Sequence, residues 1–405
     1  MSSAPNPMTE PMMEADFVLA DTALVIAPAI APKTRSTGSG PTPKAGVLTA
    51  GDIDDTLNLR AFRTYQKAAQ RTLGLPKVDL AGAIALQLKH ADGSPAPHLR
   101  VTLRDPKKSA PFFDGYSGVD GNLTVFPAAF GARPLSKVNL SVFPVDQGQT
   151  HRQTLSASAK RTVITVPFSP APAPDFLDLV FVMDTTGSMA DELNWLTKDL
   201  ARILRQARKS APKAALRYGL VVYRDTGDSY VVRNFGFTQK LPTMQGWLRN
   251  QHAAGGGDYP EAADRALQAG VALNWRRGAG KRLLFHVADA PPHTKDAKAY
   301  LTAATKAAQQ NIQIYGIGAS GVAAESEYLM RQASAVTSGR YLFLTDDSGV
   351  GHRHAEPTIS CYRATDLSSL VTRVIKSELS GQRIEAKDRD IIRRVGSYKR
   401  GRCLN

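Results

Sequence analysis

The stretch Phe176-Leu177-Asp178-Leu179-Val180-Phe181-Val182-Met183 runs directly into Asp184-Thr185-Thr186-Gly187-Ser188. An almost continuous apolar run of this length is typical of a strand that is buried on both faces of a parallel sheet. The Asp, Thr, Gly and Ser that follow favour a tight turn into a helix. We therefore expect a carboxylate and hydroxyl groups at the carboxyl edge of a sheet, where open α/β folds bind ligands.

The alternation of strand and helix continues well beyond this turn. Apolar runs predict further strands at 216–223, 281–288, 312–317 and 340–344, and helical patterns lie between them at 190–208, 260–272, 295–309 and 322–335. Strands separated by helices imply a mainly parallel sheet that is covered on both faces. We therefore assign residues 176–380 to one doubly wound α/β domain.

The flanking segments differ from this domain in composition. Residues 1–45 are rich in Pro, Ser, Thr and Gly, which is typical of a disordered tail, and the spacing within 46–77 predicts one short helix. Period-two alternation with Asp-Gly turns predicts a small antiparallel β-sandwich over 78–168. A Pro/Ala-rich linker at 169–175 precedes the α/β domain, and a basic C-terminal tail at 381–405 follows it.

Two later loops place acidic residues at the same predicted edge of the sheet. Residues 255–261 read Gly-Gly-Gly-Asp-Tyr-Pro-Glu and include Asp258, and Asp289 follows the strand predicted at 281–288. Hard oxygen ligands gathered from several loops suit Mg²⁺ or Ca²⁺ better than a soft metal. Taken alone, Asp184 to Ser188 is equally an ordinary helix-capping turn.

In these loops the chain resembles von Willebrand factor type A domains with a metal-ion-dependent adhesion site, whose first loop reads Asp-x-Ser/Thr-x-Ser. The resemblance implies that Asp184, Thr186 and Ser188 hold Mg²⁺, or alternatively Ca²⁺ or Mn²⁺, and that Asp289 contributes from the third loop. The second loop departs from the usual Thr. Its Asp258 stands in a Gly-Gly-Gly-Asp-x-Pro-Glu variant that is similar to hemicentin-like and bacterial members.

Two smaller features add to the resemblance. Asp225, in Tyr-Arg-Asp-Thr-Gly-Asp at 223–228, either orients a metal ligand or water from the second shell, or forms a plain turn with a local ion pair. The sandwich, with Asp-Gly turns at 92–93 and 120–121, is similar to carboxypeptidase regulatory-like β modules. For the sandwich we expect a spacer or binding scaffold.

The resemblance implies a non-enzymatic adhesion or assembly module whose bound ion is completed by an acidic residue of a protein partner. Competing motifs are incomplete: Ser188 lacks a Gly-x-Ser-x-Gly frame, and residues 278–281 lack the Ser/Thr of a phosphate-binding loop. Residues 316–321 match the dinucleotide pattern, but they follow a late strand of the domain and not its first. We expect no catalytic residues.

The positive net charge of the chain indicates an alternative function. The formal net charge of +15 permits attraction to nucleic acid or another anionic polymer, and basic residues concentrate at 383–402. Acidic residues are interspersed there, as in a solvated segment, so we expect nucleic acid not to be the partner.

Compartment and oligomeric state are less well determined. Cys361 and Cys403 either form one disulfide or are separate thiols in a reducing compartment. No window approaches the roughly 18 apolar residues of a membrane helix, and we recognise no signal peptide. Family resemblance favours the cell envelope or export, with the cytoplasm as the alternative. The partner's identity and the oligomeric state do not follow from the sequence.

Overall fold

The computed structural model describes residues 47–145, 148–158, 160–257, 259–319, 321–348, 357–399 and 402–404. The predicted disordered tail at 1–45 lies outside these residues. No helix in the described ranges has both the length and the apolar composition needed to cross a membrane.

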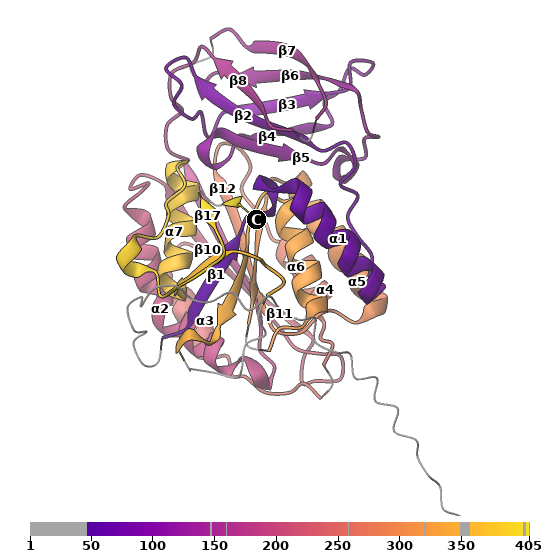
Figure 1. Cartoon of the computed structure of the whole chain (residues 1–405). Helices are drawn as coiled ribbons and strands as arrows, with labels where there is room; N and C mark the ends of the chain where they lie inside the picture. Colours follow the sequence, from indigo (N-terminus) through magenta and orange to yellow (C-terminus); the bar gives the residue numbers. More distant parts are fainter. Residues whose placement is uncertain are drawn as a thin grey trace, which may run out of the picture. The chain divides into compact units, whose positions relative to one another are not determined.

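A nine-stranded sheet is the centre of the α/β domain (Figure 1), in the order β11-β10-β9-β12-β13-β14-β1-β15-β16. Strands β10, β9, β12, β13 and β14 are parallel neighbours. The strands are β1 (Thr49–Ile53), β9 (Phe176–Asp184), β10 (Ala215–Tyr223), β11 (Val232–Thr238), β12 (Lys281–Ala288), β13 (Gln313–Gly318), β14 (Tyr341–Thr345), β15 (Tyr362–Asp366) and β16 (Arg393–Val395). This confirms the doubly wound, mainly parallel α/β fold.

Helices cover both faces of the sheet. On one face lie α4 (Ala263–Val271), α5 (Ala297–Gln309) and α6 (Ala324–Val336), and on the other α2 (Ala190–Arg208), α3 (Leu241–Arg249) and α7 (Leu367–Ser380). Strand β9 serves both cores, because Val180 and Val182 face the first set of helices while Phe181 and Met183 face the second. Each such side chain contributes about 1.5–3 kcal/mol by leaving water.

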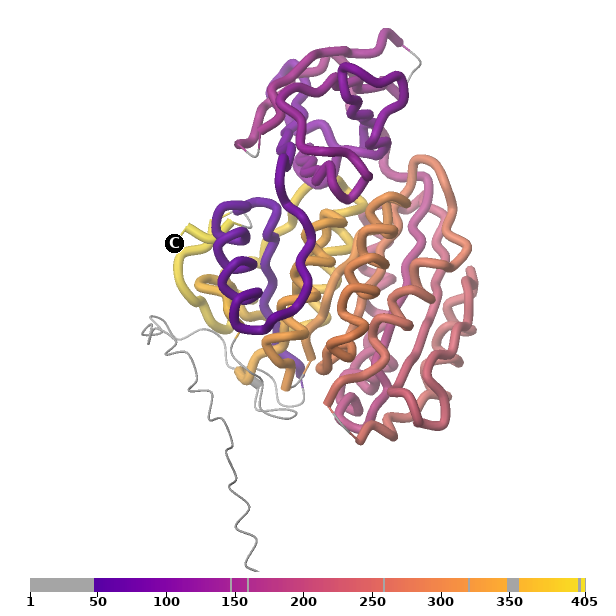
Figure 2. Tube along the Cα trace, turned by 90° about the vertical axis from the view of Figure 1, so that its right-hand side faces the viewer, coloured from indigo at the N-terminus to yellow at the C-terminus, as the bar shows by residue number. Residues whose placement is uncertain are grey.

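The segment at 46–77 contributes more than the short helix predicted there. Helix α1 (Leu59–Leu73) lies beside α6, as Figures 1 and 2 show, but the residues before it form β1. Strand β1 pairs antiparallel with β14 and with β15, inside the main sheet. Its sequence Thr-Ala-Gly-Asp-Ile is short and mixed, so local periodicity does not reveal it.

The segment after α7 is also more structured than a solvated tail. Strand β16 pairs with β15, and Cys403 is joined to Cys361 by a disulfide. The Arg383 side chain is buried and pairs with Asp54 at 3.0 Å. The sequence-based expectation fails here because the acidic partner comes from a distant part of the chain. The segment ends in a small hairpin of β17 (Tyr398–Lys399) and β18 (Arg402–Cys403).

Residues 84–166 form the predicted sandwich from two sheets, ordered β5-β2-β8 and β4-β3-β6-β7. The strands are β2 (Ile84–His90), β3 (Arg100–Arg104), β4 (Phe113–Tyr116), β5 (Asn122–Val125), β6 (Lys137–Phe143), β7 (His151–Ser156) and β8 (Thr162–Val166). The expectation of a wholly antiparallel sandwich is wrong in one pair, because β2 and β8 are parallel. Parallel neighbours need a long crossover, and the intervening strands provide it.

Candidate metal centre

The first and third loops and the turn after β10 meet at the carboxyl edge of the sheet, because β9, β12 and β10 are parallel neighbours that end at Asp184, Ala288 and Tyr223. Backbone hydrogen bonds join the loops directly. The Thr185 N–H donates to the Tyr223 carbonyl at 2.9 Å, and the Gly187 N–H donates to the Gly255 carbonyl at 3.2 Å. The first loop therefore has a defined conformation between its neighbours.

Asp184 is fully buried and is held by the loop that it begins. Its Oδ1 accepts hydrogen bonds from the Thr186 backbone N–H at 2.9 Å and from Thr186 Oγ1 at 2.7 Å. Its Oδ2 is buried and accepts no hydrogen bond from the described residues. Burial, and then the charge of Asp289, raise the pKa of Asp184 to about 7.

The structure describes the other predicted ligands except Asp258. Asp289 is buried directly after β12, and Ser188 is exposed in the turn that precedes α2. The structure therefore brings Asp184, Thr186 and Asp289 to one edge of the sheet, with Ser188 on the same loop as Asp184. Asp258 lies outside the described residues, so its role stays a prediction.

Asp225 forms a hydrogen bond with a residue of the third loop, a partner that the sequence did not specify. Its Oδ1 lies 2.8 Å from Nε2 of His293, which follows Asp289 on the third loop. The neighbouring Asp228 accepts hydrogen bonds from the Asp225 N–H at 3.2 Å and from the Gly256 N–H at 3.0 Å. Asp225 and Asp228 thus tie the second and third loops to the turn after β10.

Glu261 is a site residue that the sequence reasoning missed. Glu261 is only 4% exposed, and its Oε2 has no hydrogen-bond partner among the described residues. Burial, followed by the charges of Asp184, Asp225 and Asp228, raises the pKa of Glu261 to about 9. The signal was present in the sequence as the Glu that ends Gly-Gly-Gly-Asp-Tyr-Pro-Glu.

A buried hydrogen-bond chain lies beneath Asp184 and was also missed. Tyr223 Oη lies 3.1 Å from His286 Nε2, and His286 Nδ1 lies 2.9 Å from Tyr300 Oη. Burial lowers the pKa of His286 to about 3, so the imidazole is neutral. These residues lie within apolar sequence patterns on β10, β12 and α5. Such patterns predict positions in the hydrophobic core, so they did not indicate a role near the site.

The donor set fits a hard divalent cation. Within the described ranges, no three His, Cys, Asp or Glu side chains are arranged to hold a metal by themselves. A metal bound here would therefore also need hydroxyl ligands, such as those of Thr186 and Ser188. The observation that favours a cation is the pair of buried carboxylate oxygens, on Asp184 and Glu261, that no described hydrogen-bond donor reaches. Buried polar groups are normally partnered, and buried carboxylates are normally paired with cations.

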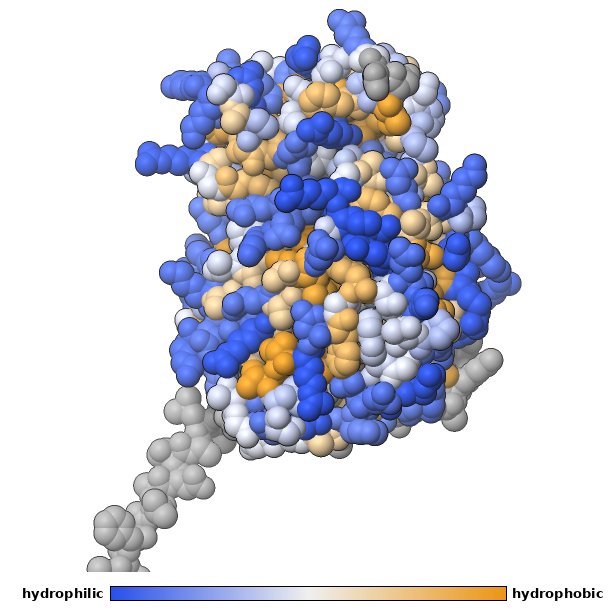
Figure 3. Space-filling model, turned by 180° about the vertical axis from the view of Figure 1, so that it is seen from behind, coloured by the Kyte–Doolittle hydropathy of each residue, from blue (hydrophilic) through white to orange (hydrophobic). Residues whose placement is uncertain are grey.

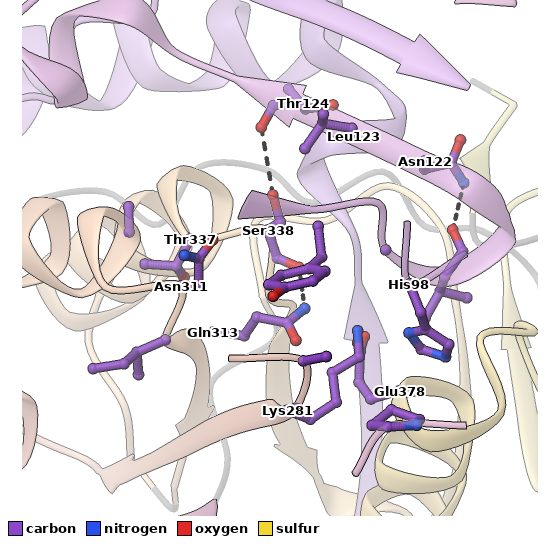
Figure 4. Close-up of a pocket in the computed structure, with 18 of the residues that line it drawn as sticks. His98, Asn122, Leu123, Thr124, Lys281, Asn311, Gln313, Thr337, Ser338 and Glu378 are labelled. Atoms are coloured by element: carbon purple, nitrogen blue, oxygen red, sulfur yellow. Dashed lines mark hydrogen bonds and ion pairs between the residues drawn. The ribbon is translucent and has the colours of Figure 1, made fainter. Parts of the chain in front are cut away.

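A cavity of about 210 Å³ lies away from these loops, at the amino ends of the strands. Figure 4 shows Lys281, at the start of β12, beside Glu378 of α7, with which it forms an ion pair of 2.9 Å. Residues of the sandwich, including Asn122 and Thr124, complete the lining. Since Asp184 and Asp289 lie at the carboxyl ends of their strands, this cavity is separate from the candidate metal centre.

The fold and the three loops define a class of protein. Residues 178–351 match the family model described as von Willebrand factor A domain. Residues 178–351 of the chain are therefore a von Willebrand factor A domain.

Several known proteins are similar to part of this chain. The von Willebrand factor A domain-containing protein 7 of Homo sapiens is 42% identical over 91 residues, which are 22% of this chain and 10% of that protein. Hemicentin-2 of Mus musculus is 28% identical over 180 residues, 44% of this chain and 3% of that protein. The alpha-protein kinase vwkA of Dictyostelium discoideum is 25% identical over 131 residues, 32% of this chain and 21% of that protein. The aligned segment spans only a small fraction of each relative.

Among solved structures, the pilus adhesin SpaC from Lactobacillus rhamnosus GG aligns with 60% of this chain and 31% of its own length. The identity is 11% and the TM-score is 0.36.

Proposed function

We propose that the α/β domain is a non-enzymatic protein-binding module, acting in adhesion or assembly, whose binding depends on a divalent metal ion. The observation that carries the proposal is the buried, unpartnered Oδ2 of Asp184, on a loop with Thr186 and Ser188, in a von Willebrand factor A domain. Mg²⁺ is the proposed ion, with Ca²⁺ or Mn²⁺ as alternatives, because all the donors are hard oxygens.

Each residue has a distinct part in this proposal. Asp184, Thr186 and Ser188 would hold the ion from the first loop, and Asp258 and Asp289 would approach it from the second and third loops, directly or through water. The bound ion would supply an electrophilic centre to which an acidic side chain of a protein partner coordinates. Hydrogen bonds from Thr186 to Asp184 fix the carboxylate before the ion arrives, which reduces the entropy lost on binding.

The neighbouring polar residues favour binding over catalysis. Covalent catalysis needs a nucleophile within hydrogen-bond reach of a base. His293, which follows Asp289 on the third loop, is paired with Asp225, while Ser188 stands exposed on another loop. The similarity to an alpha-protein kinase covers 21% of that protein, so kinase activity is not carried over to this chain.

The alternative, an electrostatic binder acting through residues 383–402, is less favoured. Arg383 is buried against Asp54, and Arg393 lies 2.7 Å from Asp347. Arginines that are already paired with carboxylates offer less charge to an anionic polymer. The exposed basic residues that the structure describes there are Lys387, Arg389, Arg394, Lys399 and Arg402, and they carry what is left of this alternative.

Calorimetric titration of Mg²⁺ into the full chain tests the proposed site. We expect saturable binding by the wild type and loss of binding in Asp184→Ala, because this substitution removes the central carboxylate. Asp191→Ala is the matched control, since Asp191 is an exposed acid in the first turn of α2. Equal binding by wild type and Asp184→Ala would refute the site.

A further inference from the structure

Glu261 is fixed between two of the loops that form the proposed site. Its backbone N–H donates to the Pro291 carbonyl at 2.9 Å, and Glu261 forms a parallel bridge with Pro292. These contacts place Glu261 beside the loop that begins at Asp289. The position of its backbone is therefore set by the third loop.

The Glu261 carboxylate faces the first loop. A Cβ built on Gly256 would lie 3.1 Å from Glu261 Oε1 and 3.3 Å from the Thr186 Cβ. Glu261 and Thr186 therefore lie against the same glycine, which has a φ of +75° and leaves room for both. Because Thr186 hydrogen-bonds Asp184, the Glu261 carboxylate borders the donor set of the proposed metal centre.

No cation among the described residues balances Glu261. The residue is 4% exposed, its Oε2 is buried without a hydrogen bond from the described residues, and no described Lys, Arg or His forms an ion pair with it. The charged groups that act on it from neighbouring loops include Asp184, Asp225 and Asp289, all carboxylates. Buried acids of this kind are ordinarily paired with a cation or bound to a metal.

We propose that Glu261 is an additional ligand of the divalent cation, bound directly or through one water. This inference rests on the proposed function, because it assigns Glu261 to the same ion as Asp184. The ion then lies among the carboxylates of Asp184, Asp289 and Glu261, of which some reach it through water, and their combined charge exceeds that of a divalent cation. Such a site holds its ion strongly and attracts a further carboxylate weakly.

Metal binding by Glu261→Gln tests the assignment, with Asp264→Asn as the matched control. Gln keeps the shape of Glu but loses the charge. Asp264 is likewise buried at 5% exposure near the start of α4, but it contacts Gln268 of its own helix at 3.4 Å. We expect Glu261→Gln to bind Mg²⁺ and Mn²⁺ about 10- to 100-fold more weakly than wild type, the range for residues that support a metal site, and Asp264→Asn to bind like wild type.

Thermal unfolding of the full-length variants, with and without Mg²⁺, separates a ligand from a structural residue. We expect metal-free Glu261→Gln to melt no lower than wild type, and Mg²⁺ to raise its midpoint less. An equal fall in midpoint with and without Mg²⁺ would show a structural role and overturn the inference. Wild-type affinity in Glu261→Gln, with binding lost in Asp184→Ala, would overturn the inference alone. Wild-type affinity in both variants would overturn the proposed site as well.

Discussion

At the scale of single residues, the hydrogen bonds of His286 to Tyr223 and Tyr300 explain why a histidine lies inside the core. A neutral imidazole has one donor nitrogen and one acceptor nitrogen. His286 Nε2 lies 3.1 Å from Tyr223 Oη and His286 Nδ1 lies 2.9 Å from Tyr300 Oη, so each ring nitrogen has a tyrosine hydroxyl as its partner. The buried histidine thereby orients the hydroxyl that lies beside the proposed metal ligand.

His286 also predicts a pH dependence of stability. Burial lowers its pKa from 6.5 to about 3, so the unfolded chain takes up the proton first as the pH falls. The stability contributed by the neutral form is complete above pH 6.5 and is lost progressively toward pH 3. We expect the free energy of unfolding to fall more steeply in wild type than in His286→Phe between pH 6.5 and about 4.5, where most carboxylates stay ionised.

Urea unfolding at a series of pH values measures this difference. Comparison of the slopes matters more than the absolute stabilities, because His286→Phe also removes the hydrogen bonds to Tyr223 and Tyr300. Parallel pH profiles for the two proteins would show that His286 does not titrate as described.

At the scale of elements, β1 shows how a short segment fits inside a larger sheet. Gly51 lies opposite Phe343 of β14, and a Cβ at this position would lie 2.6 Å from the Phe343 ring and 2.9 Å from the Tyr362 ring. A buried ion pair fixes the next residues, since Arg331 of α6 lies 2.8 Å from Asp55. The Arg331 guanidinium also lies 3.7 Å from the centre of the Tyr65 ring of α1.

Gly51→Ala is therefore expected to destabilise the protein by about 1–3 kcal/mol, the usual cost of overpacking a core. The matched control is Gly246→Ala in α3, where no atom lies within 4 Å of the added Cβ. Alanine has the higher helix propensity, so the control is expected to gain about 0.5–1 kcal/mol. Chemical denaturation followed by circular dichroism measures both changes. A Gly51→Ala variant as stable as wild type would contradict the close contacts around β1.

At the scale of the whole molecule, residues 47–77 and 381–404 both belong to the folded α/β domain. Asp54 pairs with Arg383, and Asn58 donates to the Cys403 carbonyl at 3.4 Å. Next to β16, the disulfide joins Cys403 to Cys361, a separation of 42 residues. On the face that Figure 3 shows, hydrophobic areas are interrupted by hydrophilic residues.

The disulfide predicts a redox-dependent stability. Closing a loop of this length restricts the unfolded chain, so reduction, or the substitution Cys403→Ser, is expected to cost about 2–5 kcal/mol. Thermal unfolding with and without reductant measures the loss, and Cys403→Ser, which has no bridge, should be insensitive to reductant. Alkylation of unreduced native protein followed by mass spectrometry is the direct check. Two modified thiols would contradict the bridge.

Local sequence patterns determined much of the α/β domain. Apolar runs such as 178–183 and 281–288 became buried parallel strands, and parallel neighbours end at the same edge, so the loops with Asp184 and Asp289 had to meet there. The pattern of buried and exposed positions repeats within a few residues, so it can be recognised from the local sequence. The metal ligands themselves remain predictions, including Asp258.

Contacts between segments that are far apart in the chain could be recognised only from the tertiary structure. The insertion of β1 into the sheet, the parallel pairing of β2 with β8 and the pairing of Arg383 with Asp54 each join segments that are far apart in the chain. The same holds for Glu261, whose burial among carboxylates arises only when three loops converge. Periodicity reports which side of an element is buried, but the identity of the neighbour that buries it is set by the packing of the whole chain.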